Sequence, residues 1–371
     1  MTTSKTKADV IPRLMQAVLL TGYGDYEMLS LRDDVNVPTP ASDQVLIKVG
    51  GAGINNTDIN TRLGWYSKSV KDETSKSTDV AVETEDGHDD GNGWGGSSFE
   101  FPRIQGSDCC GTIVAVGTDI DPSRLGERVL VRTMMSEGDP ADFTCTCTGS
   151  EHDGAFAEYM ATRSRHALKI ECDWTDAELA SIPCAYSTAE GLLHRAGVAA
   201  ETVLITGASG GVGSAAIQLV KRRGGKVIAV TSAAKFDDVL ALGADQVLDR
   251  SDDLVAILGE NSVDVAIDLV AGPKWPSLLE VLKRGGRYAT SGAIAGPMVE
   301  LDMRTLYLKD LSFYGATFQP DEVFENLVGY IERGEIRPAL SKTYPLSDIV
   351  AAQQDFVKKK HTGKLVLIPG H

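Results

Sequence analysis

Four glycines follow a short apolar segment in the middle of the chain, and their spacing is the clearest signal for chemistry in the sequence. Residues 203–205 are apolar, the run 206–214 reads Thr-Gly-Ala-Ser-Gly-Gly-Val-Gly-Ser, and residues 215–220 have the pattern of a helix. The first N–H groups of a helix lack partners and carry the positive end of its dipole, so such a turn can bind a pyrophosphate. The residues predicted to bind it are Ala208, Ser209, Gly210, Gly211, Val212 and Gly213.

The residue types at the end of the next strand distinguish NAD from NADP as the nicotinamide cofactor. Residues 226–231 are rich in β-branched side chains, so strand, glycine turn, helix and strand follow one another as in a doubly wound Rossmann sheet. An NAD site places Asp or Glu about 20 residues past the turn, whereas this chain has Thr231 and Ser232 there. Their hydroxyls, with the charges of Lys235 and Arg250, suit a 2′-phosphate. The sequence predicts NADPH; the alternative is that both cations are solvated surface charges.

The elements that must position these residues fall into two groups, which predict an α/β chain with a doubly wound parallel sheet and a second, β-rich domain. Early strands are predicted at 16–20, 44–49 and 111–117. Later strands are predicted at 203–205, 226–231, 246–248, 263–269, 286–290 and 311–314, with helices at 274–283 and 321–333. A helix at 346–358 and a strand at 364–368 are expected to return to the first domain. The predicted boundaries are 1–184 with 322–371 for the β-rich domain and 185–321 for the cofactor domain.

Composition limits the functional classes. The chain has 371 residues, 42% of them hydrophobic and 24% charged, which is typical of a globular protein. The 36 basic and 52 acidic residues give a net charge of −16, which disfavours nucleic acid and anionic membranes as partners. No apolar run approaches the roughly 20 residues that span a bilayer, and residues 1–13 lack an apolar signal segment. A cytoplasmic location is the default expectation.

The six cysteines and one polar stretch support two further predictions. The spacing of the cysteines fits no disulfide framework, so they are expected to be reduced thiols. Cys145 and Cys147 have only His152 nearby, too few ligands for a structural zinc site. Residues 67–98 are rich in Ser, Thr, Asp, Glu and Gly and predict a surface insertion, with a lid over the site as the alternative.

The chain resembles the medium-chain dehydrogenase/reductase superfamily, in its quinone oxidoreductase branch. The resemblance rests on the glycine turn together with four further segments: 53–58 with 62–66; 105–108 with Gly111 and 116–117; 153–159; and 182–189. It covers nearly the whole chain outside 67–98. It implies that the β-rich domain is a GroES-like catalytic domain beside the Rossmann domain, and that the chain forms a homodimer or homotetramer.

The sequence departs from the zinc alcohol dehydrogenase branch at its metal ligands. That branch holds zinc with a cysteine, a histidine and a further cysteine, and the matching positions here carry Asn55, Ser107 and Cys184. Asn and Ser are poor zinc ligands, so we expect no metal, and Cys184 is interpreted as a packing residue. Zinc-free hydride transfer from NADPH suits quinones and α,β-unsaturated carbonyls, which need less activation than a simple ketone.

The resemblance also implies residue roles. Asn55 and Tyr66 would donate hydrogen bonds to the acceptor oxygen, and Asp58 would organise their loop; alternatively, Asn55 satisfies a turn, Tyr66 packs and Asp58 caps a helix. Further cofactor contacts are expected from Thr188, Ser291, Gly292, Ala293, Ala316 and Thr317, and Lys364 matches a basic position near the phosphates.

Four functions follow from these observations. The first is an NADPH-dependent, zinc-independent quinone reductase, and the second is an enoyl or alkenal double-bond reductase of the same fold. The others are a zinc alcohol dehydrogenase and a non-catalytic NADPH-binding sensor.

Overall fold

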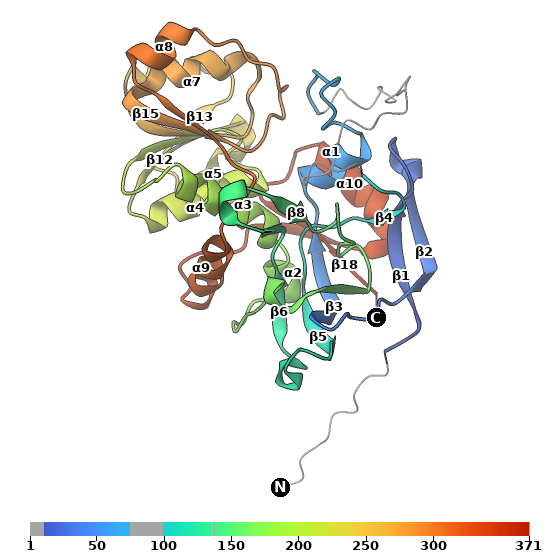
Figure 1. Cartoon of the computed structure of the whole chain (residues 1–371). Helices are drawn as coiled ribbons and strands as arrows, with labels where there is room; N and C mark the ends of the chain where they lie inside the picture. Colours follow the sequence, from blue (N-terminus) through green and yellow to red (C-terminus); the bar gives the residue numbers. More distant parts are fainter. Residues whose placement is uncertain (1–10, 75–98, 137, 371) are drawn as a thin grey trace.

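The computed structural model describes residues 11–74, 99–136 and 138–370, so most of the predicted insertion 67–98 lies outside the described residues. The chain forms two halves that meet along one side, with a parallel sheet in one half and the N- and C-terminal strands in the other (Figure 1). Nowhere in these described stretches is a helix both long and apolar enough to cross a membrane.

One half is built on a six-stranded parallel sheet. Its strands, in spatial order, are β13 (Gln246–Asp249), β12 (Lys226–Thr231), β11 (Thr202–Ile205), β14 (Val263–Asp268), β15 (Leu282–Thr290) and β16 (Ser312–Gly315). The helices of this half are α3 (Pro183–Arg195), α4 (Gly211–Arg222), α5 (Phe236–Ala241), α6 (Leu254–Leu258), α7 (Trp275–Val281), α8 (Met303–Leu308) and α9 (Asp321–Glu332).

The two faces of this sheet pack against different helices because successive strand residues point to opposite sides. On β11, Val203 and Ile205 belong to a core with residues of α3, α4 and α9, such as Phe324. Leu204 faces the other way and belongs to a core with Leu254 of α6 and Leu278 of α7. Both faces are therefore covered, which explains the continuous apolar strands and confirms the predicted doubly wound sheet.

The other half is β-rich, as predicted. Its largest sheet contains β10 (Ala167–Lys169), β6 (Arg128–Val131), β5 (Cys110–Val116), β3 (Gln44–Gly53), β18 (Lys364–Ile368) and β17 (Leu340–Pro345), with β9 (Tyr159–Arg163) also paired to β3. Smaller sheets join β2 (Leu29–Asn36), β1 (Leu14–Leu20) and β4 (Arg103–Ile104), and β7 (Met134–Ser136) with β8 (Cys145–Cys147). Its helices are α1 (Asn56–Arg62), α2 (Asp176–Leu179) and α10 (Ile349–Val357).

The end of the chain returns to the β-rich half, as the sequence predicts. β18 pairs antiparallel with β3, so Val366 faces Gly53 and Leu367 faces Ala52. β17 was not predicted, because its exposed residues, such as Lys342, lack an apolar pattern. The predicted boundaries at 184/185 and 321/322 remain predictions; they fall within α3 and at the start of α9.

Candidate active site

A cavity of about 630 Å³ lies at the carboxyl ends of the parallel strands, where doubly wound sheets bind their ligands. On the sheet side it is lined by residues that follow β11, β12, β14 and β15. On the opposite side it is lined by α1, by the segment after it and by β7 and β8. The same cavity contains all the predicted site residues except Ala208 and Asp58.

The glycine turn, residues 207–213, connects β11 to α4. Gly207 has φ +60°, a left-handed conformation that glycine adopts without strain. A Cβ on Gly213 would lie 2.4 Å from the Gly207 carbonyl oxygen and 2.6 Å from the Ala208 Cα. Ala208 is fully buried beneath the turn, so it supports the turn and does not line the cavity.

Basic groups gather at the end of the cavity that the sequence predicts to bind a ribose phosphate. Thr231, Ser232, Lys235 and Arg250 line this part of the cavity, and the Lys235 ammonium donates to Ser209 Oγ at 3.3 Å. It also donates to the carbonyl oxygens of Lys359 (2.7 Å) and His361 (2.6 Å). Burial lowers the pKa of Lys235, despite an opposing effect from Asp238.

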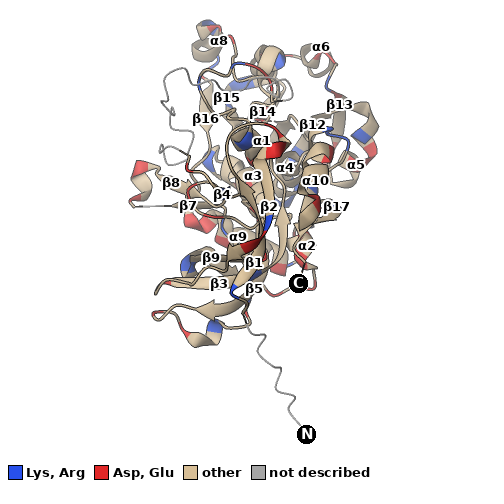
Figure 2. Ribbon diagram, turned by 90° about the vertical axis from the view of Figure 1, so that its right-hand side faces the viewer, with Lys and Arg blue, Asp and Glu red and all other residues tan. Residues whose placement is uncertain are grey.

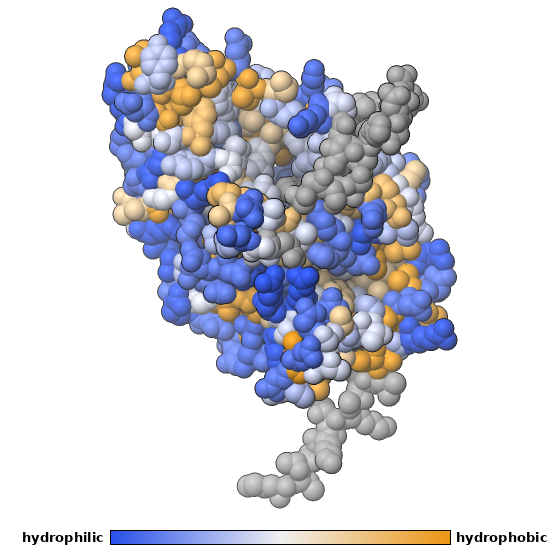
Figure 3. Space-filling view, viewed as in Figure 1, coloured by the Kyte–Doolittle hydropathy of each residue, from blue (hydrophilic) through white to orange (hydrophobic). Residues whose placement is uncertain are grey.

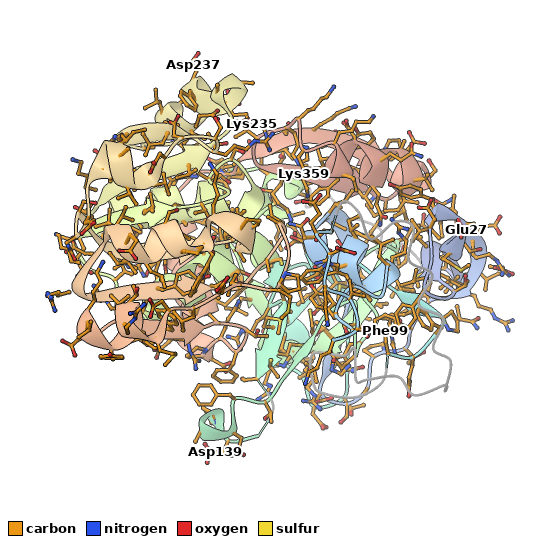
Figure 4. The ribbon with its side chains drawn as sticks, turned by 90° about the horizontal axis from the view of Figure 1, so that it is seen from above. Glu27, Phe99, Asp139, Lys235, Asp237 and Lys359 are labelled. Atoms are coloured by element: carbon orange, nitrogen blue, oxygen red, sulfur yellow. The ribbon has the colours of Figure 1, made fainter. Side chains whose placement is uncertain are left out.

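Three further basic residues line this end and were missed by sequence reasoning: Lys274, Lys359 and His361. Figure 4 shows Lys235 and Lys359 on neighbouring segments from the two halves. Burial and the charges of Lys359 and Lys235 lower the pKa of His361 to about 4. The basic run at 358–361, which is unusual in so acidic a chain, could have indicated these residues. Figure 2 shows acidic positions along the outer elements of both halves.

The nicotinamide end of the cavity, predicted from the resemblance, is lined by Thr188, Ser291, Gly292, Ala293, Ala316 and Thr317. The fully buried Asp268, which was not predicted, shapes the adjacent loop. Its carboxylate accepts hydrogen bonds from the Thr206 hydroxyl (2.5 Å) and the Tyr288 hydroxyl (2.8 Å). It also accepts bonds from the backbone N–H groups of Val270 and Ala271, so it fixes the loop that lines the cavity.

The acceptor end is the part of the cavity lined by Asn55, Asn60, Tyr66, Cys147 and Cys184. Asn55 precedes α1, and its backbone N–H donates to Asp58 Oδ2 at 2.8 Å in a capping box. Asp58 is buried outside the cavity lining, so it caps the helix, which is one of the roles considered for it. Burial raises the pKa of Asp58 to about 7.

The predicted role of Asn55 as a donor to the acceptor does not fit this geometry. Its Nδ2 group donates to Asp108 Oδ2 (2.9 Å) and to the Gly53 carbonyl (3.3 Å), which uses both N–H groups. Its Oδ1 accepts from the Lys364 ammonium at 2.5 Å. Asn55 is therefore held in a buried network and has no free N–H for a ligand.

Tyr66 remains a candidate donor at the acceptor end. It lines the cavity, and Trp65 packs edge-on against its ring at a centroid distance of 5.6 Å. Burial raises the pKa of Tyr66 far above its usual value, against a hydrogen bond with Asn60 that lowers it. The hydroxyl therefore stays protonated at neutral and moderately alkaline pH.

Lys364 lies differently from its predicted place near the phosphates. Its stem approaches the glycine turn, where the Cδ lies 2.8 Å from the position of a Cβ on Gly211. Its ammonium points to the acceptor end and is bound by Asp108 Oδ2 (2.7 Å), Asn55 Oδ1 and the Ile54 carbonyl (2.8 Å).

Known proteins resemble this chain in sequence and architecture. A family model for a zinc-binding dehydrogenase matches residues 242–367, and one for an alcohol dehydrogenase GroES-like domain matches residues 74–172. A crystal structure of a protein described as an alcohol dehydrogenase from Sinorhizobium meliloti 1021 is 44% identical, with a TM-score of 0.86 over 97% of this chain and 98% of that one. The chain belongs to the medium-chain dehydrogenase/reductase superfamily. Within this superfamily it is quinone oxidoreductase-like, and it is a nicotinamide-dependent oxidoreductase.

Two curated relatives represent this part of the superfamily. The quinone oxidoreductase of Homo sapiens is 29% identical over 96% of this chain and 98% of the relative. The NADPH-dependent alkenal/one oxidoreductase of Arabidopsis thaliana is 28% identical over 97% of this chain and 81% of the relative.

The residues present do not fit the zinc ion that the name of the dehydrogenase model implies. An amide, a hydroxyl and one thiol stand at the three matching positions, Asn55, Ser107 and Cys184, and burial raises the pKa of Cys184 to about 12. Across the described ranges, no three His, Cys, Asp or Glu side chains group closely enough to hold a metal. The Lys364 ammonium, moreover, is bonded to Asn55 itself.

Proposed function

We propose that this chain transfers hydride from NADPH to a quinone or another α,β-unsaturated carbonyl without zinc. The observation that carries the proposal is the gathering of Lys235, Lys274 and Arg250 at the ribose end of the cavity, beyond a β12 that ends in hydroxyl residues. Lys359 lies beside them, and burial lowers its pKa to about 7. In a chain of net charge −16, such a cluster favours a bound anion, and a 2′-phosphate is the anion that separates NADPH from NADH.

The residues of the chain divide the work of this reaction. The glycine turn would bind the pyrophosphate through its backbone N–H groups, and the cavity residues at the nicotinamide end would orient the ring. NADPH supplies the hydride when it is bound. Tyr66, which burial keeps protonated, would donate a hydrogen bond to the acceptor oxygen as negative charge develops there. The apolar side chains of Trp65, Met134 and Ile294 would cover the acceptor ring.

The experiment is NADPH oxidation against quinones, enones and enoyl thioesters, with NADH and a chelator as controls. Chelator-resistant turnover that prefers NADPH supports the proposal, and the best acceptor separates a quinone reductase from an enoyl or alkenal reductase. Turnover that needs zinc would favour an alcohol dehydrogenase. NADPH binding without turnover across the panel would favour a sensor.

We also propose a homo-oligomer formed at β16. Among the described strands, β16 pairs with β15 alone and leaves one edge open. Apolar side chains gather over this end of the molecule, which Figure 3 shows at the upper left around α8; they are Met298, Val299, Met303, Tyr307, Leu308 and Phe313. An exposed apolar patch beside an open strand edge is the kind of surface that pairs with a second copy.

A further inference from the structure

We propose that Asp268 is a positioning residue, which holds Ala271 in a strained backbone conformation and thereby presets a loop of the cavity, residues 269–272, for the nicotinamide cofactor. This loop follows β14 and leads towards α7. The inference rests on the cofactor part of the proposed function and is independent of the acceptor.

Ala271 has a backbone conformation that normally belongs to glycine. Its φ is +54° and its ψ is −139°, a combination in which the Cβ of any other residue is crowded by neighbouring peptide atoms. Phe143 also has a positive φ, but its ψ of +26° places it near the ordinary left-handed region. The conformation of Ala271 therefore costs free energy, which other contacts must offset.

Hydrogen bonds on the Asp268 side of the loop supply that compensation. The Ala271 N–H lies 3.2 Å and 3.1 Å from the two carboxylate oxygens of Asp268. The Val270 N–H donates to the same carboxylate at 3.0 Å. The Leu269 N–H donates to the Thr206 hydroxyl at 3.0 Å, and this hydroxyl donates to Asp268. Three successive N–H groups are thus bound from one side, which fixes the path of the loop.

Tyr288 keeps the carboxylate of Asp268 in place behind the loop. Its hydroxyl donates to Asp268 Oδ2 at 2.8 Å, and its ring packs edge-on against Trp275 at a centroid distance of 5.6 Å. Burial, and then the charge of Asp268, raise the pKa of Tyr288, so the hydroxyl keeps its proton and remains a donor. The acceptor of the loop N–H groups therefore has a fixed position.

The strained loop is also joined to the loop at the nicotinamide end. The Ala295 N–H donates to the Val270 carbonyl at 2.9 Å. A Cβ on Gly272 would lie 2.6 Å from the Ala295 carbonyl oxygen, so the two loops are in close contact. Residues 268–271 and 291–295 line the same cavity. Two lining segments are thus held in position before the cofactor arrives, and such preorganisation lowers the entropy that binding costs.

Ala271→Gly separates positioning from simple stability. A glycine adopts this conformation without strain, so we expect Tm without cofactor to rise by a few degrees. The same glycine lets the loop adopt other conformations, so we expect the Kd of NADPH to increase about three- to tenfold. A residue that served stability alone would change both quantities in the same sense. A lower Tm would show that Ala271 is not strained, and an unchanged or lower Kd would overturn the positioning role.

Asn261→Gly is the matched control. Asn261 also has a positive φ, +55°, but it lies between α6 and β14, outside the cavity lining. This variant should leave the Kd of the cofactor unchanged. If it weakened cofactor binding as much as Ala271→Gly does, the effect would belong to backbone flexibility in general and the proposal would fall.

A double-mutant cycle tests whether Asp268 acts through Ala271. Asp268→Asn presents an amide where the loop N–H groups need a carboxylate, so we expect a lower Tm and a higher Kd of the cofactor. If Asp268 holds the strained residue, the decrease in Tm should be smaller in the Ala271→Gly background than in wild type. Equal decreases would show that the two residues act independently. Tyr288→Phe, which removes one bond to the carboxylate, gives the same cycle with a milder change.

Both experiments use fluorescence titration with NADPH and with NADH, and neither needs an acceptor. If NADH binds more tightly than NADPH, the proposed cofactor preference is wrong, and the loop is still tested by the Kd of NADH. If NADPH is preferred and Ala271→Gly leaves both Kd values unchanged, the preference stands and the role of the loop is wrong.

Discussion

The Lys235 ammonium and the Ser209 hydroxyl lie 3.3 Å apart, although Lys235 follows β12 and Ser209 belongs to the glycine turn. The two turns thus present a cation and a hydroxyl to one point in the cavity. This pairing gives the proposed cofactor preference a direct test.

Lys235→Ala should weaken NADPH binding by about 10- to 100-fold, because a phosphate that replaces Ser209 Oγ as the third acceptor of this ammonium gains a charge-assisted bond of about 1.5–3 kcal/mol. NADH, which lacks the 2′-phosphate, should bind nearly as before. Fluorescence titration of both cofactors measures the effect, and Lys221→Ala is the surface control. An equal loss for NADPH and NADH would contradict the assignment of this end to the 2′-phosphate.

Gly213→Ala should destabilise the protein by about 1–3 kcal/mol, since its Cβ would meet backbone atoms of Gly207 and Ala208 that cannot move aside cheaply. Gly210→Ala is the matched control, because its Cβ would have only an ordinary contact at 3.4 Å. Thermal unfolding without cofactor measures both. Similar Tm values for the two variants would show that the turn has more room than this geometry allows.

Tyr66→Phe should lower kcat by about 100-fold with little change in cofactor affinity, since it removes one positioned donor and keeps the ring. Because burial raises the pKa of Tyr66, wild-type kcat should not fall through loss of this proton up to about pH 10. Steady-state kinetics from pH 6 to pH 10 checks both statements. A Tyr66→Phe variant with wild-type kcat would contradict the role of Tyr66 as donor to the acceptor oxygen.

Asp58 should make stability depend on pH. Burial raises its pKa from about 3.9 in the unfolded chain to about 7, so the folded state holds the proton more tightly. This stabilisation is fully present below about pH 4 and is lost as the pH rises through 7.

Asp58→Asn carries no charge and keeps an oxygen for the Asn55 N–H, so its Tm relative to wild type should rise between pH 5 and pH 8. Asp121→Asn is the control: Ser123 lowers the pKa of this exposed carboxyl, so its effect lies below pH 4. If the Tm difference between Asp58→Asn and wild type does not change with pH, the Asp58 carboxyl does not titrate as expected.

Tyr307→Glu with Leu308→Glu should convert the oligomer to a monomer, because it places charge in the apolar patch beside β16. Leu125→Glu, at another exposed leucine, should have no such effect. Light scattering after size exclusion gives the mass of each. A wild-type monomer would contradict the proposal directly.

The sequence predicted those parts of the site that are local. The glycine turn and the end of β12 lie within about 30 residues, and their pattern alone indicates a phosphate-binding turn. The partners of Asn55 are 53 and 309 residues away, at Asp108 and Lys364, so no local pattern showed that its amide was already bound.

The same reason explains why the sequence did not predict two further residues of the cavity. Lys359 and His361 reach the cavity because the segment before β18 crosses to Lys235, 124 and 126 residues away along the chain. Their composition was visible as a basic run, but only the return of the chain to β3 gives the run its place.

That return also has a consequence for synthesis. β18 is translated after the entire parallel sheet, yet it supplies the partner of β3, which leaves the ribosome some 310 residues earlier. β9 pairs with residues 44–48 of β3, so until β18 is made only the end of β3 next to the site, Ala52 and Gly53, lacks its partner. Neither Asn55 nor Asp108 then has its cation. The β-rich half is therefore completed only when the last strand of the chain has been synthesised.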